Sequence, residues 1–348
     1  MTRMNRTLRV LVVTLLAVSA GFAAFSKVGT TGAAFLKIGV GRATGMGEAF
    51  VAVADDASAS YFNPAGLASV SRSVQLNHVD WIADINHEYL TAALPVANFG
   101  TVCFSVTALS MGDMEQTTID DPTTPAREDE GTGQLFGASD FAFAVSYARI
   151  ITDKLSFGVT GKVVNQNIWD MTATAAGADL GLYYNTGFRS LRIGAVVQNF
   201  GTQLAFSGRQ LEYSIEWPDS GPPQLPGAYR TDGAPLPTTF RFGIAYDVID
   251  ACPSKLTAAV DLTHPSDINE TINFGLEYGY NDLFFMRGGY ILNTDQDYAE
   301  DVGYLTGLTA GVGLKTKPTE TLGIGVDYTF RFLQYLKPTH RVQLTVGF

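Results

Sequence analysis

The last eight residues of the chain alternate strictly between apolar side chains and polar or small ones. Val342, Leu344, Val346 and Phe348 are apolar, and the residues between them are polar or small. Successive side chains of a β-strand point to opposite faces, so this segment is expected to be a strand with one apolar face. The alternation recurs along most of the chain in segments of about ten residues, which is typical of strands that cross a membrane as a closed barrel.

Fourteen such strands are predicted after residue 72, and the terminal aromatic Phe348 resembles the end of the closing strand in bacterial outer-membrane β-barrels. The expected fold is therefore all-β, a 14-stranded antiparallel transmembrane β-barrel with an N-terminal plug segment. The predicted strands cover approximately residues 73–81, 87–96, 99–109, 140–151, 154–166, 175–185, 188–199, 238–248, 254–263, 269–280, 282–292, 302–315, 319–331 and 338–348.

The lengths of the connections support this count. Every second connection is short, whereas the long ones, at about 110–139, 167–174, 200–237 and 293–301, all fall at the other end of the barrel. Short periplasmic turns and longer external loops are typical of outer-membrane barrels. A miscount by one strand would scramble this segregation, so the pattern also predicts strand polarity.

The amino terminus has the layout of a secretory signal peptide. Arg3, Arg6 and Arg9 precede an apolar stretch from Val10 to about Ala20, which small residues follow. That stretch is too short to span a bilayer, and beyond it no run of 18 apolar residues predicts a transmembrane helix. We expect residues 1–24 to be a cleaved signal peptide and the mature chain to reach the cell outer membrane.

Charge and cysteine content exclude several classes of protein. The formal net charge is −11, which argues against nucleic acid as a partner because phosphate binding needs basic patches. Two cysteines, Cys103 and Cys252, do not make a disulfide framework. The long loops are acidic, which is expected mainly to aid solubility. A calcium or magnesium site at Asp295, Asp297 and Asp301 is the alternative, but the spacing lacks the features of an EF-hand.

Residues 25–72 do not alternate and are rich in small side chains. The glycines from Gly39 to Gly45 have the spacing GxGxxxG, and no βαβ pattern follows, so we reject a dinucleotide-binding loop and expect no cofactor. Small residues at this density suit a compact segment inside a confined space, with a turn at Asn63-Pro64. The expected division is 1–24 signal peptide, 25–72 N-terminal plug (hatch) and 73–348 transmembrane β-barrel.

The stretch from Gly39 to Leu67 resembles the N-terminal motif of the PorV/PorQ family, which is related to the FadL-type transporters of hydrophobic compounds. Val197 to Gly201, with the sequence VQNFG, resembles a mid-barrel motif of the same family. The resemblance implies a 14-stranded barrel closed by its N-terminal segment. Glu48 departs from it, because the family usually has a small residue there. The implied plug-motif residues are Gly45, Gly47, Asp55, Asp56, Asn63, Pro64, Ala65 and Gly66.

Two functions follow from this resemblance. The first is support of type IX protein secretion, with secreted cargo proteins or secretion-system components as partners at the outer-membrane lipid. The alternative is a FadL-like conduit for long-chain fatty acids or other hydrophobic small molecules. An enzyme is not expected, since no serine motif accompanies His78, His87, His264 and His340, and no metal site is assigned to these rim histidines.

Alternation also assigns faces to individual side chains. Ile324 should face lipid and Gly325 and Thr329 the interior, so arginine should be costly at Ile324 and mild at Thr329. Charged side chains expected inside the barrel are Arg241, Asp261, Glu277 and Asp327. Tyrosines expected together at the periplasmic interface are Tyr147, Tyr184, Tyr246, Tyr278 and Tyr280.

Overall fold

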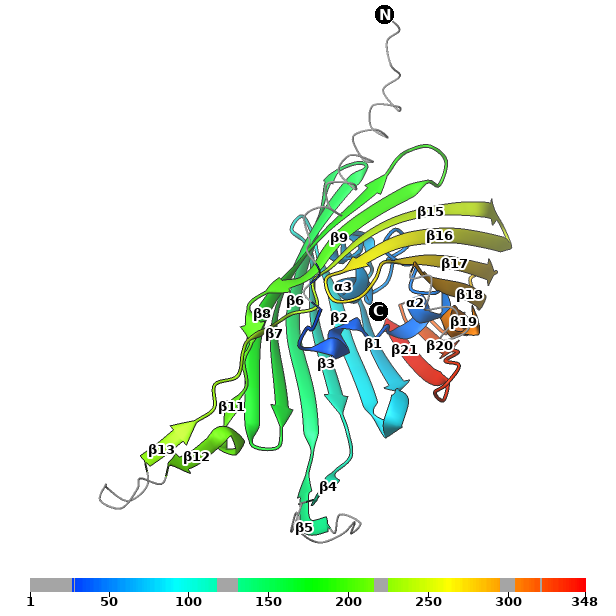
Figure 1. Cartoon of the computed structure of the whole chain (residues 1–348). Helices are drawn as coiled ribbons and strands as arrows, with labels where there is room; N and C mark the ends of the chain where they lie inside the picture. Colours follow the sequence, from blue (N-terminus) through cyan, green and yellow to red (C-terminus); the bar gives the residue numbers. More distant parts are fainter. Residues whose placement is uncertain (1–26, 28, 118–130, 216–224, 295–303, 320) are drawn as a thin grey trace, which may run out of the picture.

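A computed structural model describes residues 27, 29–117, 131–215, 225–294, 304–319 and 321–348. Within these ranges, fourteen antiparallel strands form the barrel wall (Figure 1). They are β1 (Ser73–Asp80), β2 (Asn86–Val96), β3 (Gly100–Ser110), β6 (Ala138–Thr152), β7 (Leu155–Ile168), β8 (Met171–Asn185), β9 (Arg192–Gly201), β15 (Thr239–Ala251), β16 (Ser254–Pro265), β17 (Thr271–Tyr280), β18 (Phe284–Asn293), β19 (Leu308–Thr316), β20 (Gly323–Arg331) and β21 (Thr339–Gly347).

The barrel is closed because its first and last strands pair. β1 pairs with β21 from Ser73↔Gly347 to Asp80↔His340, and β8 pairs with β9, so the sheet has no free edge around the wall. The predicted all-β, 14-stranded antiparallel barrel is therefore confirmed. No helix among the described residues has the length and hydropathy needed to cross a membrane.

The predicted segregation of the connections is confirmed. The connections after β2, β6, β8, β15, β17 and β19 are short, and this end is called the short-turn end. The opposite, long-loop end carries the hairpins β4–β5 (Met114–Thr117 and Gly131–Phe136) and β12–β13 (Glu212–Ile215 and Leu225–Ala228), which project separately at the bottom and lower left of Figure 1. It also carries β10 (Gln203–Leu204), β11 (Ser207–Gly208), β14 (Ala234–Pro235) and the short helices η3 (Ile82–Asp84), η4 (Arg209–Leu211) and η5 (Tyr304–Gly307).

One predicted loop is wrong. Residues 167–174 are not a loop: β7 and β8 continue to a two-residue turn at Trp169 and Asp170. Apolar alternation ends after Val163, but the ladder continues to Ile168 and Met171, and the Asn165 side chain donates to Thr174 across it (3.0 Å). An outward face that leaves the apolar belt needs no apolar side chains, so the alternation could not mark this part of the strands. The proposed cation ligands Asp295, Asp297 and Asp301 lie outside the described residues.

The predicted faces of the wall are confirmed. Outward side chains such as Val326, Leu276 and Leu344 are 46%, 53% and 42% exposed and form an apolar outer surface. Ile324 lies on that face by alternation with Val326, whereas Asp327 and Thr329 face inward and are buried. The five tyrosines lie at the short-turn end, where for example the Tyr147 hydroxyl donates to the carbonyl of Phe99 (2.7 Å).

The prediction that replacing Thr329 by arginine has only a mild effect on stability needs correction. Thr329 is 1% exposed, and its hydroxyl donates to the carbonyl of Gly41 (3.3 Å) inside the barrel. An arginine there would have to displace the chain that fills the lumen. Thr329 is therefore not the mild inward substitution that alternation suggested.

The lumen is filled by the chain that precedes β1. We call residues 29–72 the inner segment; it contains η1 (Ala34–Lys37), α2 (Gly41–Gly45), α3 (Ala59–Phe62) and η2 (Pro64–Ser69). Figure 1 shows α2 and α3 inside the ring of strands. Side chains from Val40 to Val53 and from Ala57 to Leu67 form a core with inward wall residues such as Tyr89 and Ala259.

The two faces of β21 provide a stability test. Leu344→Arg should destabilise the barrel in lipid by about 2–4 kcal/mol, because it places a charge on the apolar outer face. Thr345→Arg should cost less, because Thr345 is partly exposed on the inward face near the short-turn end. Urea titration after refolding into vesicles would measure both. Equal costs for the two variants would mean that the faces of β21 are assigned wrongly.

Candidate functional site: the barrel interior

Seven inward glycines on seven strands allow the inner segment to lie against the wall. A Cβ atom added at any of them would overlap or touch an atom of the inner segment; at Gly289, for example, it would overlap the backbone nitrogen of Gly47. We call this set the glycine girdle: Gly158, Gly181, Gly194, Gly243, Gly275, Gly289 and Gly311. Glycine within a strand is usually a site of close backbone approach, and here the approaching backbone is that of the inner segment.

Polar wall side chains bind the backbone of the inner segment. The Asp261 carboxylate accepts from the amides of Phe50 (2.8 Å) and Val51 (2.9 Å), and Asn273 donates to the carbonyl of Gly47 (2.7 Å). Buried backbone groups need such partners, since each one left unpaired costs about 1–3 kcal/mol. There are three further contacts of this kind. Arg341 donates to the carbonyl of Gly39, Thr309 accepts from the amide of Gly47, and Gln343 accepts from the amide of Arg42.

The residues expected to form the plug motif lie at these contacts. Asn63 is fully buried; its side chain accepts from the amide of Ala65 (3.1 Å) and donates to the carbonyls of Val51 (2.9 Å) and Leu182 (3.1 Å). Pro64 and Ala65 lie against Gly158, and Gly66 lies against Ala54. These four residues hold helix η2 against β7 and β8.

Two other glycines of the motif, Gly45 and Gly47, lie on the other side of the lumen. Gly47 has φ +62°, and a Cβ there would lie 2.7 Å from the carbonyl oxygen of Phe274 and 2.8 Å from the nitrogen of Tyr290. Both the backbone conformation and the space therefore require glycine. Gly45 lies against Gly311 and Thr329, so α2 rests directly on β19 and β20.

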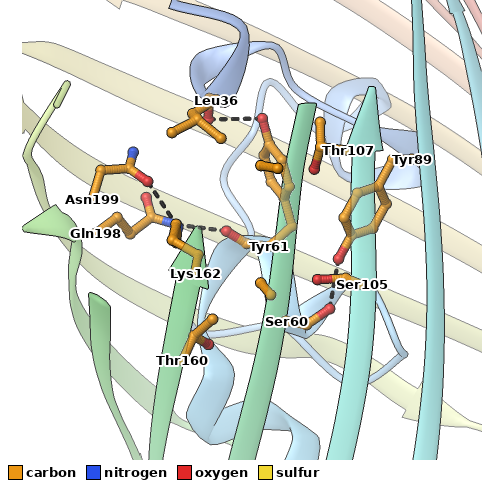
Figure 2. Close-up of a pocket in the computed structure, with 12 residues that line it drawn as sticks. Leu36, Ser60, Tyr61, Tyr89, Ser105, Thr107, Thr160, Lys162, Gln198 and Asn199 are labelled. Carbon is orange, nitrogen blue, oxygen red and sulfur yellow. Dashed lines mark hydrogen bonds between the residues drawn. The ribbon is translucent and has the colours of Figure 1, made fainter. Parts of the chain in front are cut away.

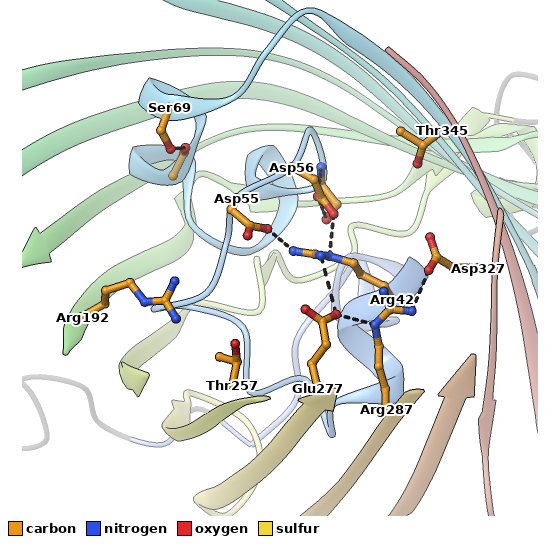
Figure 3. Close-up of polar contacts among 12 residues, drawn as sticks. Arg42, Asp55, Asp56, Ser69, Arg192, Thr257, Glu277, Arg287, Asp327 and Thr345 are labelled. Carbon is orange, nitrogen blue, oxygen red and sulfur yellow. Dashed lines mark hydrogen bonds and ion pairs between the residues drawn. The ribbon is translucent and has the colours of Figure 1, made fainter. Parts of the chain in front are cut away.

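The two aspartates of the motif belong to an ion-pair network that Figure 3 shows. Arg42 pairs with Asp55, with Asp56 (2.7 Å) and with Glu277 (3.6 Å). Arg287 joins Glu277 (2.5 Å) to Asp327 (2.6 Å), so the network continues along the inner face of the wall from β17 to β20. The prediction that Glu277 and Asp327 are interior charges is confirmed.

Lys27 and the start of the inner segment are held at the long-loop end. Lys27 pairs with Glu270 (3.0 Å), and Lys37 pairs with Asp267, which also accepts from Thr31 (2.7 Å). Burial raises the pKa of Asp267, but the bonds from Lys37 and Thr31 outweigh it and leave that pKa below its usual value. A lowered pKa keeps this carboxyl charged, so its contribution to stability is lost only in acid, as the pH falls through that pKa.

A cavity of about 220 Å³ lies between the inner segment and the wall at the long-loop end. Its lining includes Glu48, Phe62, Arg241, Ile268 and Arg331. A second cavity of about 20 Å³ adjoins it and shares Leu36, Tyr61, Gln198 and Asn199 (Figure 2).

Glu48, the departure from the PorV/PorQ pattern, has a specific role in this cavity. Its carboxylate pairs with Arg241 (3.1 Å) and Arg331 (3.4 Å), although the residue is only 6% exposed. Arg241 is thus an interior charge, as predicted. The sequence signal was available, since a charged residue stood among small ones, but its partners lie 193 and 283 positions further along the chain.

The second family-like motif, VQNFG, forms a β-bulge. The register of β8 and β9 shifts between Ala178 and Leu180, where Asn199 has φ +58°. Its amide donates to Asp179 (2.7 Å), which also pairs with Lys162 (2.7 Å). The neighbouring Gln198 donates to the carbonyl of Tyr61 (2.6 Å) and so joins the bulge to the inner segment.

The histidines do not form a common site. His87 is buried and faces inward, whereas His78 and His340 lie on the outward face beside Glu88 and Tyr328. His264 lies beside Glu270, also at the long-loop end. Among the described residues, no group of three or more His, Cys, Asp or Glu side chains could hold a metal ion, and Cys103 and Cys252 are unpaired.

Comparison with known families identifies one match. The model of the Uncharacterised protein family (UPF0164) matches residues 17–190. The resemblance to PorV/PorQ proteins stays a prediction. No curated protein matches the chain.

Solved structures that are similar to the chain include hydrocarbon channels. The Pseudomonas putida toluene transporter TodX is 13% identical, with a TM-score of 0.51 over 83% of this chain and 91% of TodX. The deltaS2 mutant of the TodX monoaromatic hydrocarbon channel is 12% identical, with a TM-score of 0.53 over 83% and 92%. The CymD monoaromatic hydrocarbon channel is 12% identical, with a TM-score of 0.50 over 93% and 99%. At these identities the likeness shows the barrel fold alone.

Two adjacent glycines of β18 test whether the girdle positions the inner segment. Gly289→Ala should destabilise the protein by about 1–3 kcal/mol and expose the inner segment to protease, because the added methyl overlaps Gly47. Gly288→Ala is the matched control, since a Cβ there has no atom within 4 Å. Thermal unfolding and limited proteolysis in detergent would compare the two. Identical behaviour of both variants would show that the close approach at Gly289 does not matter.

Proposed function

The chain belongs to the Uncharacterised protein family (UPF0164), and we propose that it is a non-enzymatic conduit through which small, largely apolar molecules cross the outer membrane. The observation that carries this proposal is a closed barrel with an apolar outer face and a cavity beside its inner segment. An apolar outer surface of this kind suits a lipid bilayer, and interior cavities of barrels hold ligands.

The structural neighbours favour a small hydrophobic solute. TodX and CymD are described as channels for toluene and other monoaromatic hydrocarbons. The alternative of long-chain fatty acids fits less well, because a cavity of about 220 Å³ is small for a long acyl chain.

The proposal includes the placement and division of the chain. Residues 1–24 would be a signal peptide that directs export, residues 25–72 a plug, and residues 73–348 the outer-membrane barrel. The plug assignment is supported by the burial of the inner segment and by its contacts with the girdle. The short-turn end would then face the periplasm, with the tyrosines at its headgroup layer.

Support of type IX secretion is the other function that the sequence suggested. It rests on the resemblance to PorV/PorQ alone, and none of the described contacts favours a protein cargo over a small solute. A strain that lacks the gene and secretes proteins poorly, with unchanged uptake of small solutes, would favour secretion over the conduit.

Passage through this barrel requires the inner segment to move. Side chains of α2 and of residues 49–53 are almost completely buried against the wall, so the lumen is closed at this level. We expect a solute to enter at the long-loop end, rest in the cavity and pass when the inner segment shifts.

A reversible cross-link between α2 and β19 tests this route. Gly45 and Gly311 approach so closely that a Cβ on Gly45 would lie 3.3 Å from the Cα of Gly311. The double variant Gly45→Cys/Gly311→Cys is made in a Cys252→Ser background. After oxidation, intact bacterial cells that carry it should take up labelled toluene no faster than cells without the protein. Reduction of the disulfide should restore uptake.

The single variants Gly45→Cys and Gly311→Cys, treated with the same oxidant, are the controls. Uptake that remains fast in the cross-linked protein would contradict a moving plug. Uptake that is no faster with the wild-type protein than without it would contradict the conduit itself.

A further inference from the structure

The geometry points to a small carboxylate with a compact apolar body as the solute, and we propose that Arg241 and Arg331 bind its carboxylate in the 220 Å³ cavity. This inference rests on the proposed conduit and specifies the chemical class of its solute.

The two arginines keep unused hydrogen-bond donors. Each contacts the Glu48 carboxylate through a single Nη atom, at 3.1 and 3.4 Å. A guanidinium has five N–H donors, and the buried Nε atoms of Arg241 and Arg331 have no hydrogen-bond partner among the described residues. A carboxylate in the cavity would take up donors of the Nη atoms that do not bind Glu48, as charge-assisted hydrogen bonds.

A third guanidinium increases the positive charge. Arg341 is 1% exposed, and it lies close enough to Arg331 and Glu48 to interact with both electrostatically. Its Nε donates to the carbonyl of Gly39 (2.8 Å) and its Nη1 to Thr339 (2.8 Å), while Nη2 has no partner within the described part of the chain.

The carboxylates nearby do not balance this charge. Arg241, Arg331 and Arg341 lie near Glu48, and the next carboxylate, Asp261, interacts with Arg241. Asp261 is already bound by the amides of Phe50 and Val51. Lys37, which also lines the cavity, is neutralised by Asp267. One positive charge is therefore left over in a largely buried site, where an unpaired charge is costly. An anion would offset it, whereas a neutral hydrocarbon would leave it unpaired.

Size and lining limit the rest of the ligand. An apolar cavity of about 150 Å³ holds benzene, so 220 Å³ accommodates a ring of that size and a carboxylate. Apolar contacts are available in the lining from Leu36, Phe62, Pro265, Ile268 and Ile291. Inorganic phosphate would satisfy the charge but leave these apolar surfaces without a partner.

Calorimetry on the purified full chain in a nonionic detergent tests the inference with benzoate and its neutral analogue benzamide. Benzoate should bind saturably, and benzamide should bind about tenfold more weakly or worse, as expected for lost charged hydrogen bonds. Arg241→Gln and Arg331→Gln should each weaken benzoate binding about tenfold or more without changing benzamide binding. Arg209→Gln is the control, because that side chain is 81% exposed at the long-loop end.

Glu48→Gln gives an independent result of opposite sign. Removal of the competing carboxylate should strengthen benzoate binding while the arginines stay in place. This variant keeps the inference falsifiable if an arginine variant fails to fold. Equal binding of benzoate and benzamide, weaker benzoate binding in Glu48→Gln, or displacement of benzoate by equimolar phosphate would overturn the carboxylate assignment.

Failure of this inference and failure of the conduit are distinguishable. If the protein speeds toluene uptake by cells but does not bind benzoate, the conduit stands and the anion site is overturned. Benzoate binding that responds to the arginine variants, without faster uptake of either solute, would support the site and overturn the conduit.

Discussion

The structure depends on one constraint: the backbone of the inner segment is buried in the lumen, and its polar groups need partners there. A peptide group left unpaired in such a site costs about 1–3 kcal/mol, and an irregular segment cannot satisfy all of its own groups. The wall provides the missing partners through Asp261, Asn273, Thr309, Gln343 and Arg341. These contacts explain why strands with an apolar outer face have specific polar side chains inside.

Close approach and hydrogen bonding work together in this arrangement. A wall amide or carboxylate reaches the inner backbone only if the adjacent strands have no bulky side chains in the way, and the glycine girdle provides that space. Gly243 lies opposite Asp261 in the sheet, and Gly275 lies opposite Gly289. The cavity at Arg241 and Arg331 lies above this tightly packed level, at the long-loop end, where the inner segment leaves space.

Sequence alternation predicted the strands because period-two patterning reports directly which face meets lipid. It predicted neither the turn at Trp169 and Asp170, where the outward face of β7 and β8 is polar, nor the bulge at Asn199. The partners of Glu48 and Asp261 were also beyond reach, since they lie roughly 190 to 280 positions away and depend on how the inner segment enters the barrel. The motif glycines suggested confinement, but the wall glycines that confine them are recognisable only once the register is known.

The central claim is that the inner segment is docked by its backbone inside the barrel. Hydrogen exchange of the full chain in detergent, followed by mass spectrometry of peptides that cover residues 41–54, tests it most directly. The amides of Phe50 and Val51, bound by Asp261, should exchange as slowly as those of the wall strands. Asp261→Ala should release both amides without changing exchange in β1 or β21. Fast exchange of these amides in the wild-type protein would contradict a docked inner segment.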